Sequence, residues 1–114
     1  MVALLECTLR DGSYAINFQF TASDTKIIAK GLEDAGFRLI EVGHGVGLRA
    51  SVSGYGAAAA TDTEYLEAAA SVLTKARFGM FCIPGIAQLE DVDLCASYGA
   101  KFIRIGTNVT DPGA

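Results

Sequence analysis

Residues 38–42, Arg-Leu-Ile-Glu-Val, and residues 78–83, Phe-Gly-Met-Phe-Cys-Ile, are the stretches of the chain that decide its fold. Both are short apolar runs, and between them Leu66, Ala69 and Val72 recur at helical spacing. Two apolar strands joined through an amphipathic helix are typical of a parallel pair in an α/β sheet. The centre of the chain therefore predicts a βαβ unit.

The same alternation continues toward both ends of the chain. Residues 3–9 form an apolar run that ends in a polar Arg-Asp-Gly, and residues 101–105 form a fourth run of strand-forming residues. The predicted order is βαβαβαβ, in one domain over residues 1–114. Two parallel α/β architectures accommodate it. One is a small doubly wound sheet of the flavodoxin type, and the other is the N-terminal half of a (β/α)8 TIM barrel, which needs ~250 residues in full.

The helices are marked by capping signals at their starts. Thr21 is followed three residues later by Asp24, and Thr61 by Glu64, which is the spacing of a capping box. Gly36 stands where the first helix should end. The apolar stripes that the three helices should bury consist of Ile27, Ile28, Leu32 and Ala35, then Leu66, Ala69, Val72 and Leu73, then Leu89, Val92 and Cys95.

The composition limits the classes of function. Hydrophobic residues make up 51% of the 114 residues and the mean hydropathy is +0.34, which is too apolar for a disordered segment. Nine Lys and Arg against thirteen Asp and Glu give a formal net charge of -4. Proteins that bind through nucleic-acid phosphates carry the opposite balance. A nucleic-acid partner is therefore not expected.

Targeting signals and cysteine usage favour the cytoplasm. The longest apolar stretches, residues 78–83 and 57–60, are far shorter than the ~20 residues of a membrane-spanning helix. Residues 1–6 lack the basic start of a secretory signal. The three cysteines are an odd number without CxxC spacing, so we expect reduced, buried thiols in a cytoplasmic protein with no membrane partner.

Polar residues gather at the carboxyl ends of the predicted strands, where parallel α/β proteins place their active residues. They are Thr8, Arg10, Asp11 and Tyr14 after the first strand, Glu41 and His44 after the second, Pro84 and Gly85 after the third, and Arg104, Thr107 and Asn108 after the fourth. The opposite strand ends carry apolar residues. This asymmetry predicts a functional site at one edge of the sheet.

Three charged residues are the strongest candidates for chemistry. Asp11 and Glu41 are one βα unit apart, so they should lie at the ends of neighbouring strands. A carboxylate there can bind Mg²⁺ or Mn²⁺ through oxygen. The forked donors of Arg10 can hold a substrate carboxylate or a developing enolate. The alternative is a structural ion pair between Arg10 and an acid of the loop.

His44 and Tyr14 each allow two interpretations. His44, the only histidine, lies between two glycines just after Glu41, where it could transfer protons, although a lone histidine is often structural. Tyr14 could supply a hydroxyl donor or pack its ring over the loop. Residues 43–47, Gly-His-Gly-Val-Gly, lack GxGxxG spacing and a following lysine, so they favour loop geometry over nucleotide binding.

Four motifs in order along the chain resemble one family. They are residues 7–15 (CTLRDGSYA), 40–45 (IEVGHG), 84–87 (PGIA) and 103–107 (IRIGT). The first two resemble the strand motifs of the DRE-TIM metallolyases, in which Arg10, Asp11 and Glu41 would be the residues of the name. The last two resemble the 4-hydroxy-2-oxovalerate aldolases in particular. The resemblance extends over residues 5–111.

The resemblance implies a TIM barrel and a class II, metal-dependent cleavage of a 4-hydroxy-2-oxo acid into pyruvate and an aldehyde. Asp11 would be a ligand of Mn²⁺ or Mg²⁺, which would polarise the 2-keto oxygen. Arg10 would stabilise the pyruvate enolate with support from Glu41, and Tyr14 and His44 complete the catalytic candidates. Such aldolases usually work beside an acylating aldehyde dehydrogenase, which is the implied protein partner.

The chain departs from the family pattern in two places. Where Tyr14 stands, the aldolases commonly have a histidine base, and a phenol with an ordinary pKa near ~10 is a poor base at neutral pH. The family completes its metal site with a His-x-His pair from a later strand, and this sequence has one histidine. We therefore expect a fragment that is inactive alone and that associates through its open sheet, for example as two paired copies.

Two alternatives to the aldolase remain open. The same superfamily includes acyl-CoA-condensing synthases and carboxyltransferases, whose substrate contacts would come from strands outside this sequence. A flavodoxin-like binding module without chemistry is the other alternative. It predicts a monomer with helices on both faces of the sheet and no cluster of Arg10, Asp11 and Glu41.

Overall fold

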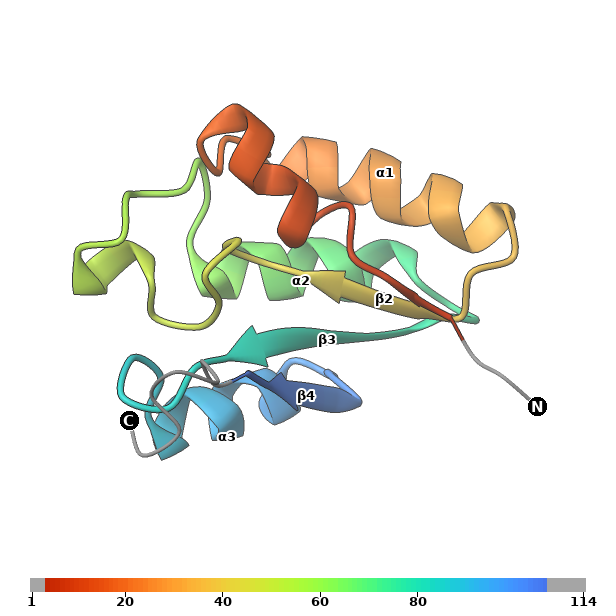
Figure 1. The fold of residues 1–114 in the computed structure, drawn as a ribbon. Coiled ribbons are helices and arrows are strands. Elements are labelled where there is room, and N and C mark those ends of the chain that lie inside the picture. The colour runs from red at the N-terminus through yellow and green to blue at the C-terminus, as the bar shows by residue number, and fades with distance from the viewer. Residues whose placement is uncertain (1–3, 107–114) are drawn as a thin grey trace.

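Four parallel strands and three α-helices alternate along residues 4–106, the part of the chain that the computed structural model describes (Figure 1). The strands are β1 (Leu5–Glu6), β2 (Leu39–Val42), β3 (Arg77–Cys82) and β4 (Phe102–Ile105), the helices are α1 (Ala22–Asp34), α2 (Asp62–Val72) and α3 (Leu89–Ser97), and the short 3-10 helices are η1 (Asp11–Ile16) and η2 (Ser51–Ser53). The predicted βαβαβαβ order is confirmed.

The order of the strands in space decides between the two predicted architectures. The strands lie side by side as β1-β2-β3-β4, and every neighbouring pair is parallel. A flavodoxin-like sheet places its second strand outside the first, whereas each strand of a (β/α)8 barrel pairs with the next one along the chain. The α/β fold is therefore of the barrel type, and the doubly wound alternative is wrong for the described residues.

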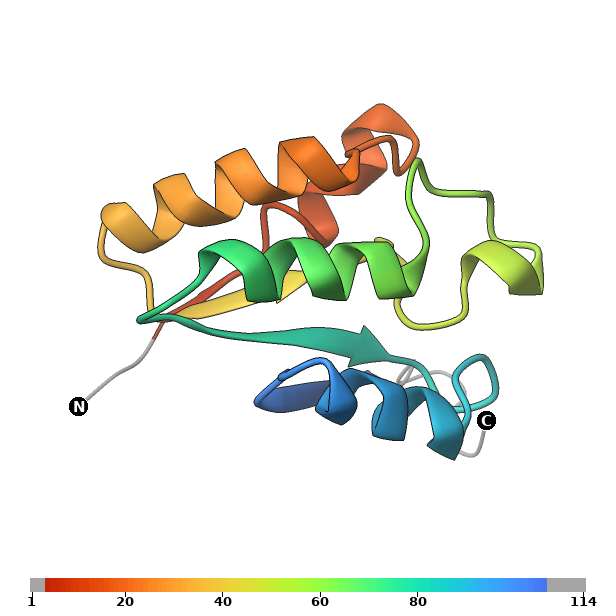
Figure 2. The ribbon, with the colours of Figure 1, turned by 180° about the vertical axis from the view of Figure 1, so that it is seen from behind.

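All three helices pack into one core on the same face of the sheet. That core contains Ala29 of α1, Leu66 of α2 and Cys95 of α3 together with Ile40 and Met80 of the sheet, each at most 1% exposed. Figure 2 shows α1 and α2 running side by side along the sheet. Burying one large apolar side chain stabilises a fold by about 1.5–3 kcal/mol, so this face carries most of the packing energy.

The opposite face of the sheet is only partly buried. Leu5, Leu39 and Phe102 line an open pocket of about 250 Å³ there, and Arg104 lies at its border. A Cβ atom on Gly79 would lie 2.3 Å from the Phe102 carbonyl oxygen, so only glycine allows β3 and β4 to approach this closely. In a closed barrel this face would be the interior, which layers of side chains fill.

β1 is shorter than its apolar run predicts. The strand consists of Leu5 and Glu6, whereas the run covers residues 3–9. The backbone N–H groups of residues 10–12 all donate to the Cys7 carbonyl, at 2.8 to 3.3 Å. These turn bonds redirect the chain into η1, because the same backbone cannot extend the ladder and turn at once.

α1 has the predicted start and part of the predicted buried face. The Thr21–Asp24 capping box forms as expected, with both of its bonds at 3.0 Å. The prediction that Ile27 is buried is wrong, because that side chain points to solvent, and so does Leu89 at the start of α3. Ile28 and Leu32 are partly buried against the core as predicted, and Ala29 is fully buried beside them.

A buried acid on α1 fixes the entry to β3. The Glu33 carboxylate accepts the backbone N–H groups of Thr74, Lys75 and Ala76 at 2.9, 2.7 and 2.7 Å. The hydrogen bonds from Ala76 and Lys75 are the main reason that the pKa of Glu33 falls to about 2. The carboxylate therefore takes the place of a backbone partner for the turn after α2.

The thiols agree only in part with the sequence expectations. All three cysteines are free, but only Cys95 is buried, and Cys7 and Cys82 are half-buried. The expectation that every thiol is buried is therefore wrong for two of them. Among residues 4–106, no helix combines the length and the apolar character that crossing a membrane requires.

Candidate active site

The turn after β1 delivers Arg10 to the end of β2. Arg10 Nε donates to Glu41 Oε1 at 2.7 Å, and Arg10 Nη1 donates to the Gly45 carbonyl at 3.0 Å. The Ser13 hydroxyl donates to the Arg10 carbonyl at 2.6 Å and holds the backbone of the turn. The side chain of Arg10 is 11% exposed and that of Glu41 is 0% exposed. The predicted Arg10–Glu41 pair is thus a fixed, buried contact.

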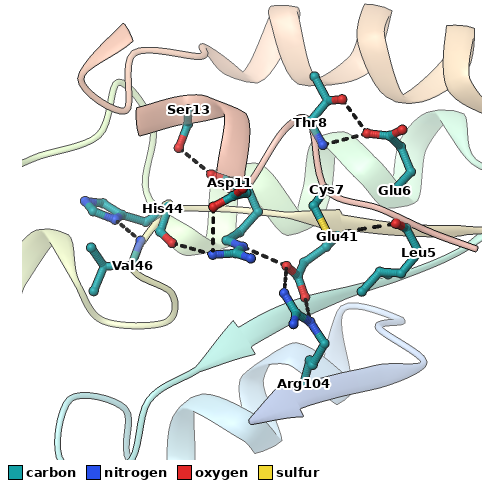
Figure 3. Close-up of polar contacts among 12 residues, drawn as sticks. Leu5, Glu6, Cys7, Thr8, Asp11, Ser13, Glu41, His44, Val46 and Arg104 are labelled. Atoms are coloured by element: carbon teal, nitrogen blue, oxygen red, sulfur yellow. Dashed lines mark hydrogen bonds and ion pairs between the residues drawn. The ribbon is translucent and has the colours of Figure 1, made fainter. Parts of the chain in front are cut away.

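A second arginine reaches the same carboxylate from β4 (Figure 3). Arg104 Nε donates to Glu41 Oε2 at 2.8 Å, and Arg104 Nη2 donates to Glu41 Oε1 at 2.9 Å. Gly79 is the neighbour of Glu41 on β3, which lies between β2 and β4. Because glycine has no side chain, nothing on β3 separates Glu41 from Arg104 at that position. The guanidinium groups of Arg10 and Arg104 lie 4.4 and 4.8 Å from the centre of the Phe81 ring, a favourable cation–π arrangement.

The cluster of Arg10, Glu41 and Arg104 carries one net positive charge. Burial alone would raise the pKa of Glu41, but the hydrogen bonds from Arg104 and Arg10 outweigh it and hold that pKa below its usual value. Glu41 is therefore ionised at neutral pH and acts as an acceptor only. Burial, followed by the Glu41 carboxylate, raises the pKa of the neighbouring Cys7 thiol, which stays protonated. The nearby Asp11 carboxylate, 3.7 Å from Arg10, balances that charge at the exposed side of the cluster.

Asp11 lies beside this cluster but points toward solvent. Its side chain is 68% exposed, and Asp11 Oδ1 is 3.7 Å from Arg10 Nη1. Within residues 4–106, no three His, Cys, Asp or Glu side chains lie close enough together to hold a metal ion. Asp11 therefore offers one carboxylate, whereas Mg²⁺ and Ca²⁺ sites use six or more oxygen ligands. The described residues do not form a metal site, and no chemical step is assigned to a metal here.

His44 lies apart from the cluster and is held by its own loop. Its Nδ1 accepts the Val46 N–H at 3.0 Å, so the proton is on Nε2, which donates to the Gly56 carbonyl at 2.7 Å. The ring is 1% exposed and stacks on Phe18 with 3.9 Å between ring centres. Both ring nitrogens are therefore occupied by backbone groups, and the structure does not bring His44 together with Arg10 and Glu41.

Tyr14 packs its ring over the loop after β2. The ring meets Phe18 edge-on, with 5.1 Å between the ring centres, and is half-exposed. A Cβ atom on Gly45 would lie 2.7 Å from Phe18 and 2.9 Å from Tyr14, so a residue with a side chain does not fit there. The rings of Tyr14 and Phe18 thus pack together against the loop at Gly45.

The remaining strand-end residues lie in turns or outside the described residues. Thr8 bonds to Glu6 through both its backbone N–H and its hydroxyl. Pro84 and Gly85 form the turn after β3, with Gly85 at a φ of 94°. Thr107 and Asn108 lie outside the described residues, so the structure does not place them.

Sequence reasoning missed an ion pair that holds the long loop after β2. Arg49 Nε and Nη2 donate to the two carboxylate oxygens of Asp91 at 2.8 and 3.1 Å, and the Arg49 backbone N–H donates to Asp62 at 2.8 Å. These bonds fasten the loop to the first turns of α2 and α3. The partners are distant in sequence and follow no motif, so no local signal identifies them.

Comparison with known proteins places the chain in a family. The model of the HMGL-like family matches residues 1–112. The chain belongs to the HMGL-like family. The resemblance to the DRE-TIM metallolyases is therefore confirmed, and it covers nearly the whole chain.

Several curated relatives of this HMGL-like chain are named as lyases. The 4-hydroxy-2-oxovalerate aldolases of Carboxydothermus hydrogenoformans and Moorella thermoacetica are 42% and 44% identical over 110 residues, which are 96% of this chain and 33% and 32% of those proteins. The oxaloacetate decarboxylase of Mycobacterium tuberculosis is 45% identical over 108 residues, which are 95% of this chain and 32% of that protein. The chain spans about a third of the length of these relatives.

Proposed function

We propose that this chain supplies the enolate-binding part of a carbon–carbon lyase that acts on a small 2-oxo acid and releases pyruvate. The observation that carries the proposal is the buried carboxylate of Glu41 between Arg10 and Arg104, which holds two guanidinium groups at the carboxyl ends of the strands. The relatives named 4-hydroxy-2-oxovalerate aldolase support cleavage of a 4-hydroxy-2-oxo acid as the reaction. Because the chain spans about a third of their length, we propose that it is inactive alone.

The proposed aldol cleavage uses Arg10 at the enolate. When the C3–C4 bond breaks, its electron pair stays on C3 and the 4-hydroxyl proton passes to a base supplied from outside the described residues, so the products are an aldehyde and the enolate of pyruvate. Arg10 donates to the enolate oxygen, where negative charge develops. Glu41 keeps Arg10 in place. Asp11 is proposed as one ligand of Mn²⁺ or Mg²⁺, a Lewis acid when bound, whose full set of ligands residues 4–106 do not supply.

The need of the aldol cleavage for such a base favours a second candidate reaction. Both nitrogens of His44 are hydrogen-bonded to backbone groups, and a phenol such as the side chain of Tyr14 is a weak general base. Decarboxylation of a 2-oxo acid with a carboxylate on C3 passes through the same enolate and needs no base. The C3–carboxylate bond breaks, CO₂ leaves, and C3 then takes a proton from water. This reaction corresponds to the name of the Mycobacterium tuberculosis relative, oxaloacetate decarboxylase.

The proposed partners depend on which reaction operates. Aldol cleavage releases an aldehyde, so an acylating aldehyde dehydrogenase is a partner for that reaction only. The acyl-CoA-condensing and carboxyltransferase alternatives use the same Arg10–Glu41 pair but need substrate contacts outside the described residues. The half-buried sheet face with Leu5, Leu39 and Phe102 also leads us to propose that the isolated chain self-associates.

A chimeric protein tests the proposed function. Residues 1–112 would replace the matching third of the Carboxydothermus hydrogenoformans aldolase, and pyruvate release would be followed by NADH oxidation with lactate dehydrogenase. We expect pyruvate from 4-hydroxy-2-oxopentanoate or from oxaloacetate with Mn²⁺, and loss of release in Arg10→Gln but not in the Arg38→Gln control. A chimera that folds and releases no pyruvate from either acid contradicts the proposal. Metal-dependent release by the 114-residue chain alone contradicts its expected inactivity.

A further inference from the structure

Arg10 and Arg104 share the Glu41 carboxylate unequally. Arg104 binds it through two nitrogens, with Nε on Oε2 and Nη2 on Oε1. Arg10 binds it through Nε alone, on Oε1. An arginine and a carboxylate commonly form two parallel hydrogen bonds. In this site Arg104 occupies the two-bond position, so Arg10 is left with one bond.

This sharing leaves one nitrogen of Arg10 available. Its Nη1 donates to the Gly45 carbonyl at 3.0 Å, and its Nε donates to Glu41. Nη2 donates to no nitrogen or oxygen atom of residues 4–106, although the Cys7 thiol lies close to the Arg10 guanidinium. No fully buried side-chain nitrogen or oxygen in that range lacks a partner, so Nη2 is not fully buried. Nη2 is therefore the donor of Arg10 that can meet an oxygen atom from outside the cluster.

We propose that Arg104 is a positioning residue that keeps Arg10 Nη2 available for an oxygen atom of the bound 2-oxo acid. It does so by holding both oxygens of Glu41, which prevents Glu41 from taking Nε and Nη2 of Arg10 together. The identity of the ligand rests on the proposed function. The orientation of Arg10 does not depend on the proposed function, because the contacts of Arg104 and Glu41 determine that orientation without a ligand.

The loss of Arg104 changes Arg10 for a physical reason. Glu41 Oε2 has Arg104 Nε as its hydrogen-bond donor, and a buried carboxylate oxygen without a donor is unfavourable. Arg10 Nη2 is a donor of the same guanidinium group whose Nε already binds Glu41. The flat Phe81 ring, 4.4 Å from the Arg10 guanidinium, allows that group to turn in its own plane. Arg10 then closes on Glu41 with two bonds, and the ligand loses its donor.

Two substitutions of Arg104 separate the effect of its hydrogen-bond geometry from the effect of its charge. Arg104→Lys keeps the positive charge but has no fork to hold both oxygens of Glu41, and Arg104→Met removes the charge as well. Arg38→Lys is the matched control, because its guanidinium donates to the backbone carbonyls of Glu33 and Phe37, away from the site. Because Arg104 lies on an edge strand and is 42% exposed, the lysine variant should fold, as circular dichroism would verify.

The first measurement needs no ligand. Nitrogen-15 NMR of the arginine side chains in the 114-residue chain reports the hydrogen exchange of each Nη group. In the wild type and in Arg38→Lys, we expect the Arg10 Nη2 protons to exchange rapidly. In Arg104→Lys they should be slowed, because Nη2 is then bonded to Glu41. Unchanged Arg10 signals in Arg104→Lys overturn the inference.

The second measurement uses oxalate, a planar mimic of the pyruvate enolate, titrated into the same chain. We expect Arg104→Lys and Arg104→Met to lose affinity by about tenfold, the equivalent of one charge-assisted hydrogen bond. Wild-type affinity in Arg104→Lys would mean that only the charge matters and would overturn the positioning role. If oxalate does not bind the wild type but the Arg10 exchange changes as expected, the proposed function fails and the positioning role stands.

Discussion

Replacing Glu41 with glutamine should lower the free energy of unfolding by about 3 kcal/mol. The carboxylate accepts three hydrogen bonds from two cations and is fully buried. Glutamine fits the same space but turns an NH₂ group toward a guanidinium. Removing one partner of a buried ion pair costs about 3–5 kcal/mol. The lower end applies because Arg104 is 42% exposed and can turn to water, whereas Arg10 cannot.

Urea unfolding at pH 7, followed by circular dichroism, measures this loss. Glu67→Gln on the exposed side of α2 is the matched control, and its effect should stay within about 0.5 kcal/mol. The pKa of Glu41 is lowered in the folded protein, so its ionised form stabilises fully above the unfolded value near ~4.3. The difference between wild type and Glu41→Gln should vanish as the pH falls through the lower folded-state pKa. Equal midpoints for both variants at pH 7 would refute the reasoning.

Three further predictions concern stability and assembly. Backbone N–H groups lower the pKa of Glu33 to about 2, so its carboxylate stabilises the fold fully above pH ~4.3 and loses this effect as the pH falls through about 2. Glu33→Gln should remove that stability, and acid unfolding curves that match the wild type would contradict this. Gly79→Ala should lower the melting temperature, because its Cβ meets the Phe102 carbonyl, whereas Gly31→Ala in α1 has free space and should raise it. Light scattering at micromolar concentration should show dimers or larger species, and a monomer would count against association through the open sheet.

Local sequence signals predicted the elements better than their arrangement. The Thr21 and Thr61 capping boxes form as predicted, because each depends on residues three positions apart. The order of the strands depends on contacts between distant segments, so the sequence left two architectures open. The end of β1 was also missed, because a turn onto the Cys7 carbonyl uses backbone groups that have no side-chain signal.

The part of the candidate site that comes from neighbouring strands was predicted from the sequence. Arg10 and Glu41 were expected together because consecutive parallel strands end side by side. Arg104 was identified only as a strand-end residue, since its hold on Glu41 crosses β3 and depends on Gly79. The ring of His44 gave an ambiguous signal, because only the folded loop shows that backbone groups occupy both nitrogens.

The Glu41 carboxylate joins the turn after β1 to β4, which are the two outer parts of the sheet. A further strand that paired with the open side of β4 would alter the tilt of that strand and, with it, the guanidinium of Arg104. The change in the position of Arg104 would reach Arg10 through the Glu41 carboxylate that both arginines bind. Closing the sheet and orienting the Arg10 guanidinium would then be one event.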